Sequence, residues 1–207
     1  LVREEGHVYS LAASNGFLFS GSESKNIRVW KKLNTLSGFK CGSGFVKAII
    51  VSGGRIFTGH QDGKIRVWNM KIKDQENSDE TVSFKRTGTI PSWKEEITSS
   101  VNPKNYVRVR RKKRVLKIKH SDAVSCMGVA ERDDLLYSGS WDKTVKVWSL
   151  SNGFKFQESI DAHEDAVNTV ATGFESMVFT GSADGTVKAW KREFNEKGTK
   201  HRLVRTP

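Results

Sequence analysis

The stretch Leu136–Trp148, LYSGSWDKTVKVW, decides the fold of this chain. Apolar and polar side chains roughly alternate in Leu136–Ser138 and again in Thr144–Trp148, which is the period of a strand with one buried face. Between these runs, Gly139–Lys143 supplies small and aspartate residues that allow a backbone to reverse direction. The stretch therefore predicts two antiparallel strands joined by a tight turn, with a tryptophan at the end of the second strand.

The same pattern occurs three more times along the chain, as FLFSGSESKNIRVW (Phe17–Trp30), IFTGHQDGKIRVW (Ile56–Trp68) and VFTGSADGTVKAW (Val178–Trp190). The strand-ending tryptophans are spaced by 38, 80 and 42 residues. The spacing indicates a period of about 40 residues, with an insertion of similar length after the second repeat. A repeat of about 40–45 residues with this turn and this strand end is typical of WD40 blades. The chain resembles the WD40 family over nearly its whole length.

The resemblance implies an all-β propeller in which each repeat forms one four-stranded blade. We expect residues 1–207 to form a partial propeller, with repeats at about 1–38, 39–90, 120–160 and 161–207 and a basic insertion at 91–119. Because WD40 propellers usually have seven blades and an open array exposes edges, the four repeats are expected to be a fragment of a seven-bladed propeller. None of the four tryptophans is followed by the aspartate that gives the family its name.

Five segments resemble the plant Jingubang-type group of WD40 proteins more closely. They are Gly6–Ala12, Lys25–Trp30, Phe57–Trp68, Asn102–Val107 and Thr180–Lys188. The match extends into the insertion between repeats 2 and 3, which generic propellers do not carry. It implies a regulatory scaffold in intracellular signalling.

The insertion is also where the charge of the protein is concentrated. The formal net charge is +12, and residues 97–119 hold nine Lys and Arg and no acidic residue, so the repeats themselves are nearly balanced. A capping-box pattern, Ser92 followed by Glu95, predicts a short helix over about 92–100. Alternating apolar and basic residues then predict a β-hairpin with strands Tyr106–Arg110 and Val115–Lys119. In repeat 2, residues 69–80 are predicted to be a loop and 81–90 the outer strand.

Two sets of polar residues in the regular repeats have the residue types of a hydrolase triad: His120, Ser138 and Asp142, and their copy His163, Thr180 and Asp184. In WD40 proteins the matching positions form a structural hydrogen-bond network with the strand-ending tryptophan, here Trp148 and Trp190. Two copies in neighbouring repeats, one with Thr for Ser, favour the structural role, and no G-x-S-x-G elbow is present. We therefore predict no catalytic residue.

Repeats 1 and 2 lack the complete set, because Ser24 replaces the turn aspartate and Gly42 replaces the histidine. Looser blades are expected there. The two cysteines and five histidines have no metal-ligand spacing, and no motif calls for a cofactor or a small-molecule substrate. No apolar run is long enough to span a membrane. These features favour a cytoplasmic or nuclear protein.

The turns between the second and third strands of each blade are expected to face the rim where WD40 proteins bind partners. Candidate rim residues are Gln61, Asp122, Trp141 and Asp165. Trp141 is the most informative, because tryptophan in an exposed turn is a frequent interface anchor. The alternative is that it lies flat across the neighbouring blade.

The basic arm within 104–119 has three interpretations. Its residues include Arg108, Arg110, Arg111, Lys112, Lys113 and Arg114. It is a solvated hairpin, a nuclear-import or nucleic-acid-binding segment, or a grip for an acidic segment of a partner. Tyr106 is the one aromatic residue beside the arm. Proteins that bind single-stranded nucleic acid by stacking usually present several aromatic side chains, so this feature gives weak support for such binding. The sequence therefore favours a scaffold for other proteins, with nucleic-acid binding by the arm as the alternative.

Overall fold

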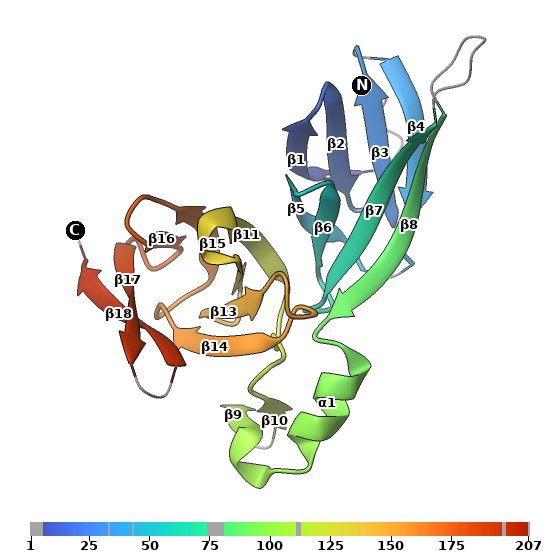
Figure 1. The fold of residues 1–207 in the computed structure, drawn as a ribbon. Helices are drawn as coiled ribbons and strands as arrows, with labels where there is room; N and C mark the ends of the chain where they lie inside the picture. The colour runs from blue at the N-terminus through green and yellow to red at the C-terminus, as the bar shows by residue number, and fades with distance from the viewer. Residues whose placement is uncertain are drawn as a thin grey trace.

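The structure is a computed structural model, and it describes residues 6–32, 34–42, 44–73, 81–110, 113–195 and 198–206. The chain folds into four antiparallel sheets of four strands each, which lie one after another along an open arc (Figure 1). We call these sheets blades 1 to 4. The all-β propeller architecture predicted from the repeats is confirmed.

Each blade pairs its strands in chain order. Blade 1 consists of β1 (Val8–Ser14), β2 (Phe17–Ser22), β3 (Asn26–Lys31) and β4 (Asn34–Lys40). Blade 2 consists of β5 (Val46–Ser52), β6 (Arg55–His60), β7 (Ile65–Lys73) and β8 (Thr81–Ile90). Blade 3 consists of β11 (Val124–Ala130), β12 (Leu135–Ser140), β13 (Thr144–Ser149) and β14 (Phe156–Asp161). Blade 4 consists of β15 (Val167–Thr172), β16 (Met177–Ser182), β17 (Val187–Asn195) and β18 (Gly198–Arg205).

The hydrophobic core lies between the blades rather than inside any one of them. Tyr137, Val145 and Val147 on one face of blade 3 pack with Val167 and Trp190 of blade 4. Blades 1 and 2, and blades 2 and 3, share equivalent clusters. Both faces of an interior blade are buried, so consecutive apolar residues of one strand enter different clusters: Val147 packs with blade 4 and Trp148 with blade 2.

A glycine in the second strand of blades 1, 2 and 3 allows the next blade to approach. A Cβ added to Gly59 would lie 2.7 Å from Val124 of blade 3, and one added to Gly139 would lie 2.8 Å from Val167 of blade 4. Distances this short are not tolerated, so a larger residue would push the innermost strand of the next blade outward. The repeated Ser/Thr-Gly dipeptide is therefore a packing requirement.

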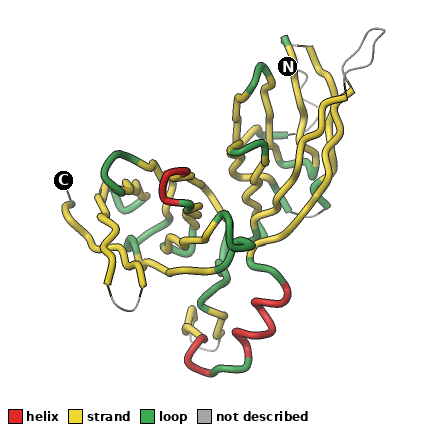
Figure 2. Tube along the Cα trace, viewed as in Figure 1, coloured by secondary structure: helices red, strands yellow, loops and turns green. Residues whose placement is uncertain are grey.

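The insertion contains the α-helix α1 (Trp93–Ser100), a 3₁₀ turn (Pro103–Asn105) and a hairpin of β9 (Tyr106–Arg110) and β10 (Lys113–Leu116). Figure 2 shows this helical segment leaving the strands of the arc and returning to them. The predicted capping box is present at Ser92 and Glu95. Among the described residues, no helix has the length and apolar character needed to cross a membrane.

Two boundaries differ from the sequence prediction. The second strand of the hairpin ends at Leu116, because the Lys119 N–H bonds back to the Leu116 carbonyl at 2.8 Å and Ile118 is buried in the resulting turn. Residues 69–73 are not a loop but continue β7, where they pair with the start of β8. Residues 74–80 of the predicted loop lie outside the described part of the chain.

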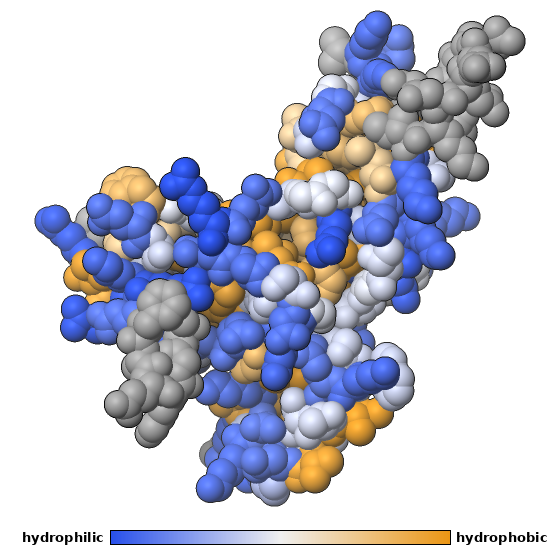
Figure 3. All heavy atoms as spheres, in the orientation of Figure 1, coloured by the Kyte–Doolittle hydropathy of each residue, from blue (hydrophilic) through white to orange (hydrophobic). Residues whose placement is uncertain are grey.

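Helix α1 holds the insertion to the blades by its acidic side chains. The Glu95 carboxylate accepts the Phe156 N–H of blade 3 at 3.1 Å, and Glu96 pairs with Lys64 at 3.4 Å and with Lys119 at 2.7 Å. The apolar side chains of Trp93 and Ile97 are exposed instead. Figure 3 shows hydrophobic surface over this helix. The insertion is therefore fixed to blades 2 and 3 at several points.

Candidate functional site

The polar residues predicted in blade 3 lie in one hydrogen-bonded chain. His120 Nδ1 lies 3.0 Å from the Asp142 carboxylate, and His120 Nε2 lies 2.9 Å from the Ser138 hydroxyl. The Trp148 indole N–H donates to the same hydroxyl at 3.0 Å. Ser138 is completely buried and His120 is nearly so, so substrate has no path to the hydroxyl. The three residues that have the side-chain types of a catalytic triad are therefore close together, but they lie in the interior of the blade.

Blade 4 repeats this arrangement with threonine in place of serine. His163 lies 2.9 Å from Asp184 and 2.8 Å from the Thr180 hydroxyl, to which Trp190 donates at 2.9 Å. The near-identity of the two sets is what a structural network predicts, because buried polar groups are tolerated where each finds a partner.

Thr144 and Thr186 belong to the network and were not identified from the sequence. Each lies two residues after the turn aspartate and donates its hydroxyl to that carboxylate at 2.7 Å. The backbone N–H of Thr144 also bonds to Asp142, at 3.1 Å. The signal was available in the D-x-T spacing shared by repeats 3 and 4.

The electrostatics of blade 3 suit a permanent structural role. Burial lowers the pKa of His120, which favours the neutral ring and an Nδ1–H that donates to Asp142. Burial alone would raise the pKa of Asp142, but His120 and the hydrogen bond from Thr144 outweigh it and hold the pKa well below its usual range. The turn aspartate is therefore ionised at neutral pH and fully hydrogen-bonded.

Blade 2, one of the two blades expected to be looser, builds its network in a different way. His60, which is fully buried in β6, places Nε2 2.7 Å from the Thr58 hydroxyl, and Trp68 donates to that hydroxyl at 3.0 Å. The turn residue Asp62 pairs with buried Arg66 at 2.6 Å. A histidine from the strand thus replaces one from the preceding loop.

Blade 1 has a reduced version. Trp30 donates to the Ser20 hydroxyl at 3.2 Å, and the Ser22 and Ser24 hydroxyls lie 2.9 Å apart. Glu23, in the same turn, accepts hydrogen bonds from His7 and from the Tyr9 hydroxyl, both at 2.8 Å.

Replacing Ser138 with Ala is expected to lower the free energy of unfolding by about 1–3 kcal/mol, because His120 and Trp148 would each lose a buried partner. Urea unfolding followed by tryptophan fluorescence measures the change. Ser138→Thr is the matched control, since blade 4 uses threonine at this position, and it is expected to retain more of the stability. An unchanged unfolding midpoint in Ser138→Ala would contradict a structural role for the network.

The predicted rim lies at the edge where the turns between the second and third strands meet the loops entering each blade. The Trp141 N–H bonds to Ala123 at 3.1 Å, and the Gln61 N–H bonds to Phe45 at 3.0 Å. Asp122 and Asp165 lie in these entry loops, and each accepts the N–H of the next residue at 2.7 Å. The rim residues are thus spread over blades 2, 3 and 4.

Trp141 is one of three aromatic residues, from three different blades, whose rings surround the Lys47 ammonium. Its side chain is 41% exposed, and Lys47 of blade 2 places Nζ 5.2 Å from its ring centroid. The same Nζ lies 3.2 Å from the Tyr9 ring and 5.5 Å from the Phe45 ring. Trp141 therefore contacts the neighbouring blade and still presents apolar surface to solvent.

Tyr9, Phe45 and Lys47 also lie at the rim and were not among the residues predicted from the sequence. Burial among the rings lowers the pKa of Lys47, with Glu23 acting in the opposite direction. A sequence signal was present, since Tyr9 and Phe45 each adjoin the valine that opens the first strand of a repeat.

The basic arm is only partly described. Arg108 and Arg114 are exposed and lie opposite one another in the hairpin. Arg111 and Lys112 lie outside the described residues, and for Arg110 and Lys113 the backbone alone is described. The hairpin stands beside blade 3, and a cleft of about 600 Å³ separates it from the Trp141 turn.

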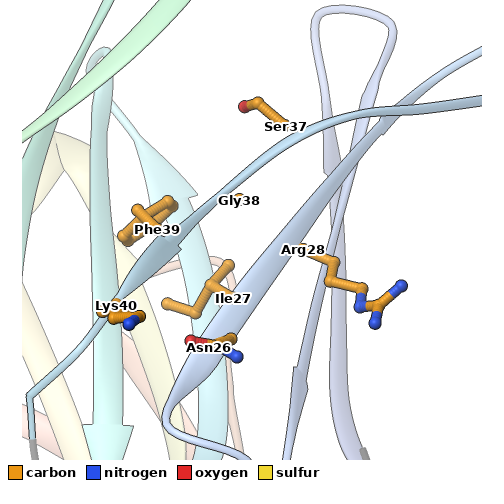
Figure 4. Close-up of a pocket in the computed structure, with 7 residues that line it drawn as sticks. All are labelled: Asn26, Ile27, Arg28, Ser37, Gly38, Phe39 and Lys40. Carbon is orange, nitrogen blue, oxygen red and sulfur yellow. The ribbon is translucent and has the colours of Figure 1, made fainter. Parts of the chain in front are cut away.

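A second hollow, of about 310 Å³, lies on β3 and β4 of blade 1. Figure 4 shows the side chains of Arg28 and Phe39 pointing away from one another across these strands. Such divergent groups do not form a binding site. In the described part of the chain, no group of three His, Cys, Asp or Glu could hold a metal ion, and Cys41 and Cys126 are free thiols.

A protein-family model described as WD domain, G-beta repeat, matches residues 1–31, 31–69, 112–149 and 154–191, which together make up more than half of the chain. Among curated proteins, small ribosomal subunit protein RACK1y of Oryza sativa subsp. japonica is 36% identical over 74 residues, 34% of this chain and 22% of that protein. Mitochondrial division protein 1 of Schizosaccharomyces pombe is 32% identical over 107 residues, 52% of this chain and 16% of that protein.

Among solved structures, the WD40 β-propeller domain of Doa1 is similar over 98% of this chain and 55% of that chain, with a TM-score of 0.65 and 16% sequence identity. This likeness supports the fold alone. The chain thus spans about half the length of that domain and less than a quarter of the two curated relatives.

Proposed function

The chain belongs to the WD40 repeat family, and on that premise we propose that it is a non-catalytic scaffold that binds other proteins through its rim. WD40 domains generally act in this way. The observation that carries the proposal is the exposed Trp141 ring beside the Lys47 ammonium, which also lies on the rings of Tyr9 and Phe45. Large aromatic side chains of limited freedom are the usual anchors of protein interfaces.

The burial of the His/hydroxyl/Asp sets supports the non-catalytic part of the proposal. A nucleophile must reach its substrate, whereas Ser138 and Thr180 are both almost fully buried beneath a tryptophan indole. We assign these residues to blade stability.

We further propose that the scaffold acts in intracellular regulation or signalling and belongs to the plant Jingubang-type group, in which the intact propeller has seven blades. The support is the resemblance of the five segments, including Asn102–Val107 in the insertion. Cytoplasmic or nuclear location is supported by the composition of the Arg110–Arg114 run and by the relative named as a ribosomal subunit protein.

Nucleic-acid binding by the hairpin is the second candidate function. Exposed Arg108 and Arg114 favour it, with Tyr106 beside them as a stacking surface. Its signature is an affinity that falls steeply and linearly with the logarithm of salt concentration.

Replacing Trp141 with Ala is expected to weaken partner binding at least about tenfold, which corresponds to about 1.4 kcal/mol and is modest for an interface anchor. The probe is a phage-displayed peptide library selected on the full chain, with the affinity of enriched peptides then measured for each variant. Phe174→Ala is the matched control, since Phe174 is 76% exposed in the β15–β16 turn at the opposite edge of the blades. Enriched peptides that bind the Trp141 variant as well as the wild type would overturn the rim proposal.

A further inference from the structure

The cleft between the hairpin and blade 3 brings together the basic arm and the rim, which are separate in the sequence. Its volume is about 600 Å³. Figure 1 shows the hairpin beside β14 of blade 3, with α1 on its other side. One wall is the hairpin, through Tyr106–Val109, Val115 and Lys117; the other is blade 3, through the Trp141–Thr144 turn and Ser159.

The cleft has an excess of positive charge. Six basic residues line it: Lys104, Arg108, Lys117, Lys119, Lys143 and Lys146. They face three aspartates, of which Asp142 already accepts the buried hydrogen bonds of the blade network. Lys119 is paired with Glu96. Six basic residues against three aspartates give the cleft a positive field, which attracts an anionic ligand.

Lys146 is the buried cation of this cleft. It is 2% exposed, and its Nζ donates to the Lys117 carbonyl at 2.7 Å and to the Ser159 hydroxyl at 3.0 Å. Burial lowers its pKa to about 8, against the attraction of Asp142 and Asp161. A carboxylate entering the cleft would stabilise the charged form of this lysine.

Apolar groups occupy the same cleft. Val107, Val109 and Trp141 line it and are each more than 40% exposed. A ligand that fits therefore combines negative charge with apolar side chains, as an acidic peptide does. A nucleic-acid backbone carries a charge at every nucleotide and would meet the exposed carboxylates of Asp122 and Asp161, whereas a peptide can place neutral residues opposite them.

The cleft is also pre-formed. The Lys117 N–H bonds to the Asn105 carbonyl at 2.6 Å at the base of the hairpin, and Glu96 ties the following segment to blade 2 through Lys64. A wall that is already held in place reduces the entropy lost on binding.

We propose that this cleft binds an acidic, partly apolar segment of a partner protein, with Lys104, Arg108 and Lys117 as charge contacts and Trp141 as an apolar contact. This inference rests on the proposed scaffold function and names the chemistry of the partner.

The test is fluorescence anisotropy with the full chain and a labelled peptide of about eight residues in which glutamate alternates with valine, at about 0.15 M salt. A peptide with glutamine for glutamate is the ligand control. The variant Lys104→Ser/Arg108→Ser/Lys117→Ser removes three exposed charges from the cleft. The matched control Lys85→Ser/Lys155→Ser/Lys191→Ser removes three exposed charges elsewhere.

We expect the glutamate peptide to bind, the glutamine peptide to bind at least about tenfold more weakly, and the cleft variant to lose at least about tenfold in affinity. The control variant is expected to stay within about twofold of the wild type. Thermal unfolding verifies that both variants are folded.

Three results would overturn the inference: no binding of the glutamate peptide, equal loss in the cleft and control variants, or tighter binding of labelled single-stranded RNA than of the peptide. The last result would assign the cleft to nucleic acid. If library peptides depend on Trp141 while the glutamate peptide does not bind, the cleft inference alone fails and the rim scaffold stands.

Discussion

Replacing Trp148 with Ala is expected to lower the free energy of unfolding by about 3–5 kcal/mol, the range for large aromatic side chains removed from a core. Trp148 is 1% exposed in the cluster between blades 2 and 3, and its ring meets Phe156 edge-on at 5.5 Å. The substitution leaves a cavity between two blades and removes the donor to Ser138. Urea unfolding measures this loss of stability as a lower midpoint concentration, with an unchanged dependence of the unfolding free energy on urea concentration.

Two further variants separate the contributions. Trp148→Phe keeps most of the packing and loses the indole N–H, so its cost should be the smaller one, about 1–3 kcal/mol. Trp141→Ala is the comparison in the same blade, because Trp141 is 41% exposed and its removal leaves no enclosed cavity, so its cost is expected to be well below that of Trp148→Ala. Equal costs for Trp141→Ala and Trp148→Ala would contradict the assignment of one tryptophan to the rim and the other to the core.

Replacing Asp142 with Ala is expected to cost at least about 3 kcal/mol, because several buried donors lose their acceptor and each unsatisfied group costs about 1–3 kcal/mol. Its side chain is 7% exposed and accepts hydrogen bonds from His120, from the Ser121 N–H and from both the N–H and the hydroxyl of Thr144. Asp122→Ala is the control, since that exposed carboxylate accepts one local N–H. A cost no larger than that of the control would show that the network is dispensable.

The Asp142 carboxylate also predicts an acid-dependent loss of stability. Its pKa is lower in the folded than in the unfolded chain, where it is about 3.9, so the unfolded chain binds the extra proton. The stabilisation is complete above the unfolded pKa and is lost as the pH falls through the folded one. Below about pH 4, Asp142→Asn should therefore lose less stability than the wild type; an equal loss would contradict this assignment.

Much of the fold was predictable from local patterns. Alternating apolar residues, the Ser/Thr-Gly dipeptide of the second strand and the tryptophan at the end of the third strand recur in every repeat, and each is a local requirement of one blade. The strands β8 and β9 and the cap of α1 were predicted for the same reason. Residues 69–73 were wrongly predicted as a loop, because their polar composition resembles a turn while the pairing with β8 makes them a strand.

The site was predictable only where the repeat pattern was complete. His120 and Asp142 stand at family spacing, so their proximity followed from the resemblance. His60 was not predicted as part of the network. It bonds to Thr58 on its own strand, whereas the family pattern places the histidine in the preceding loop, where this chain has Gly42. The network requires a donor at one point in space, and more than one position in the sequence can supply it.

The sequence by itself determined that each repeat is a four-stranded blade, since strand period and turn chemistry act between residues close in the chain. Only the tertiary structure decided what lies between the blades and beside them. The Lys47 ammonium among three rings, and the hairpin set against Trp141 and Lys146, join segments that no local pattern connects. Their positions follow from blade packing and from the ion pairs of α1, which depend on the whole fold.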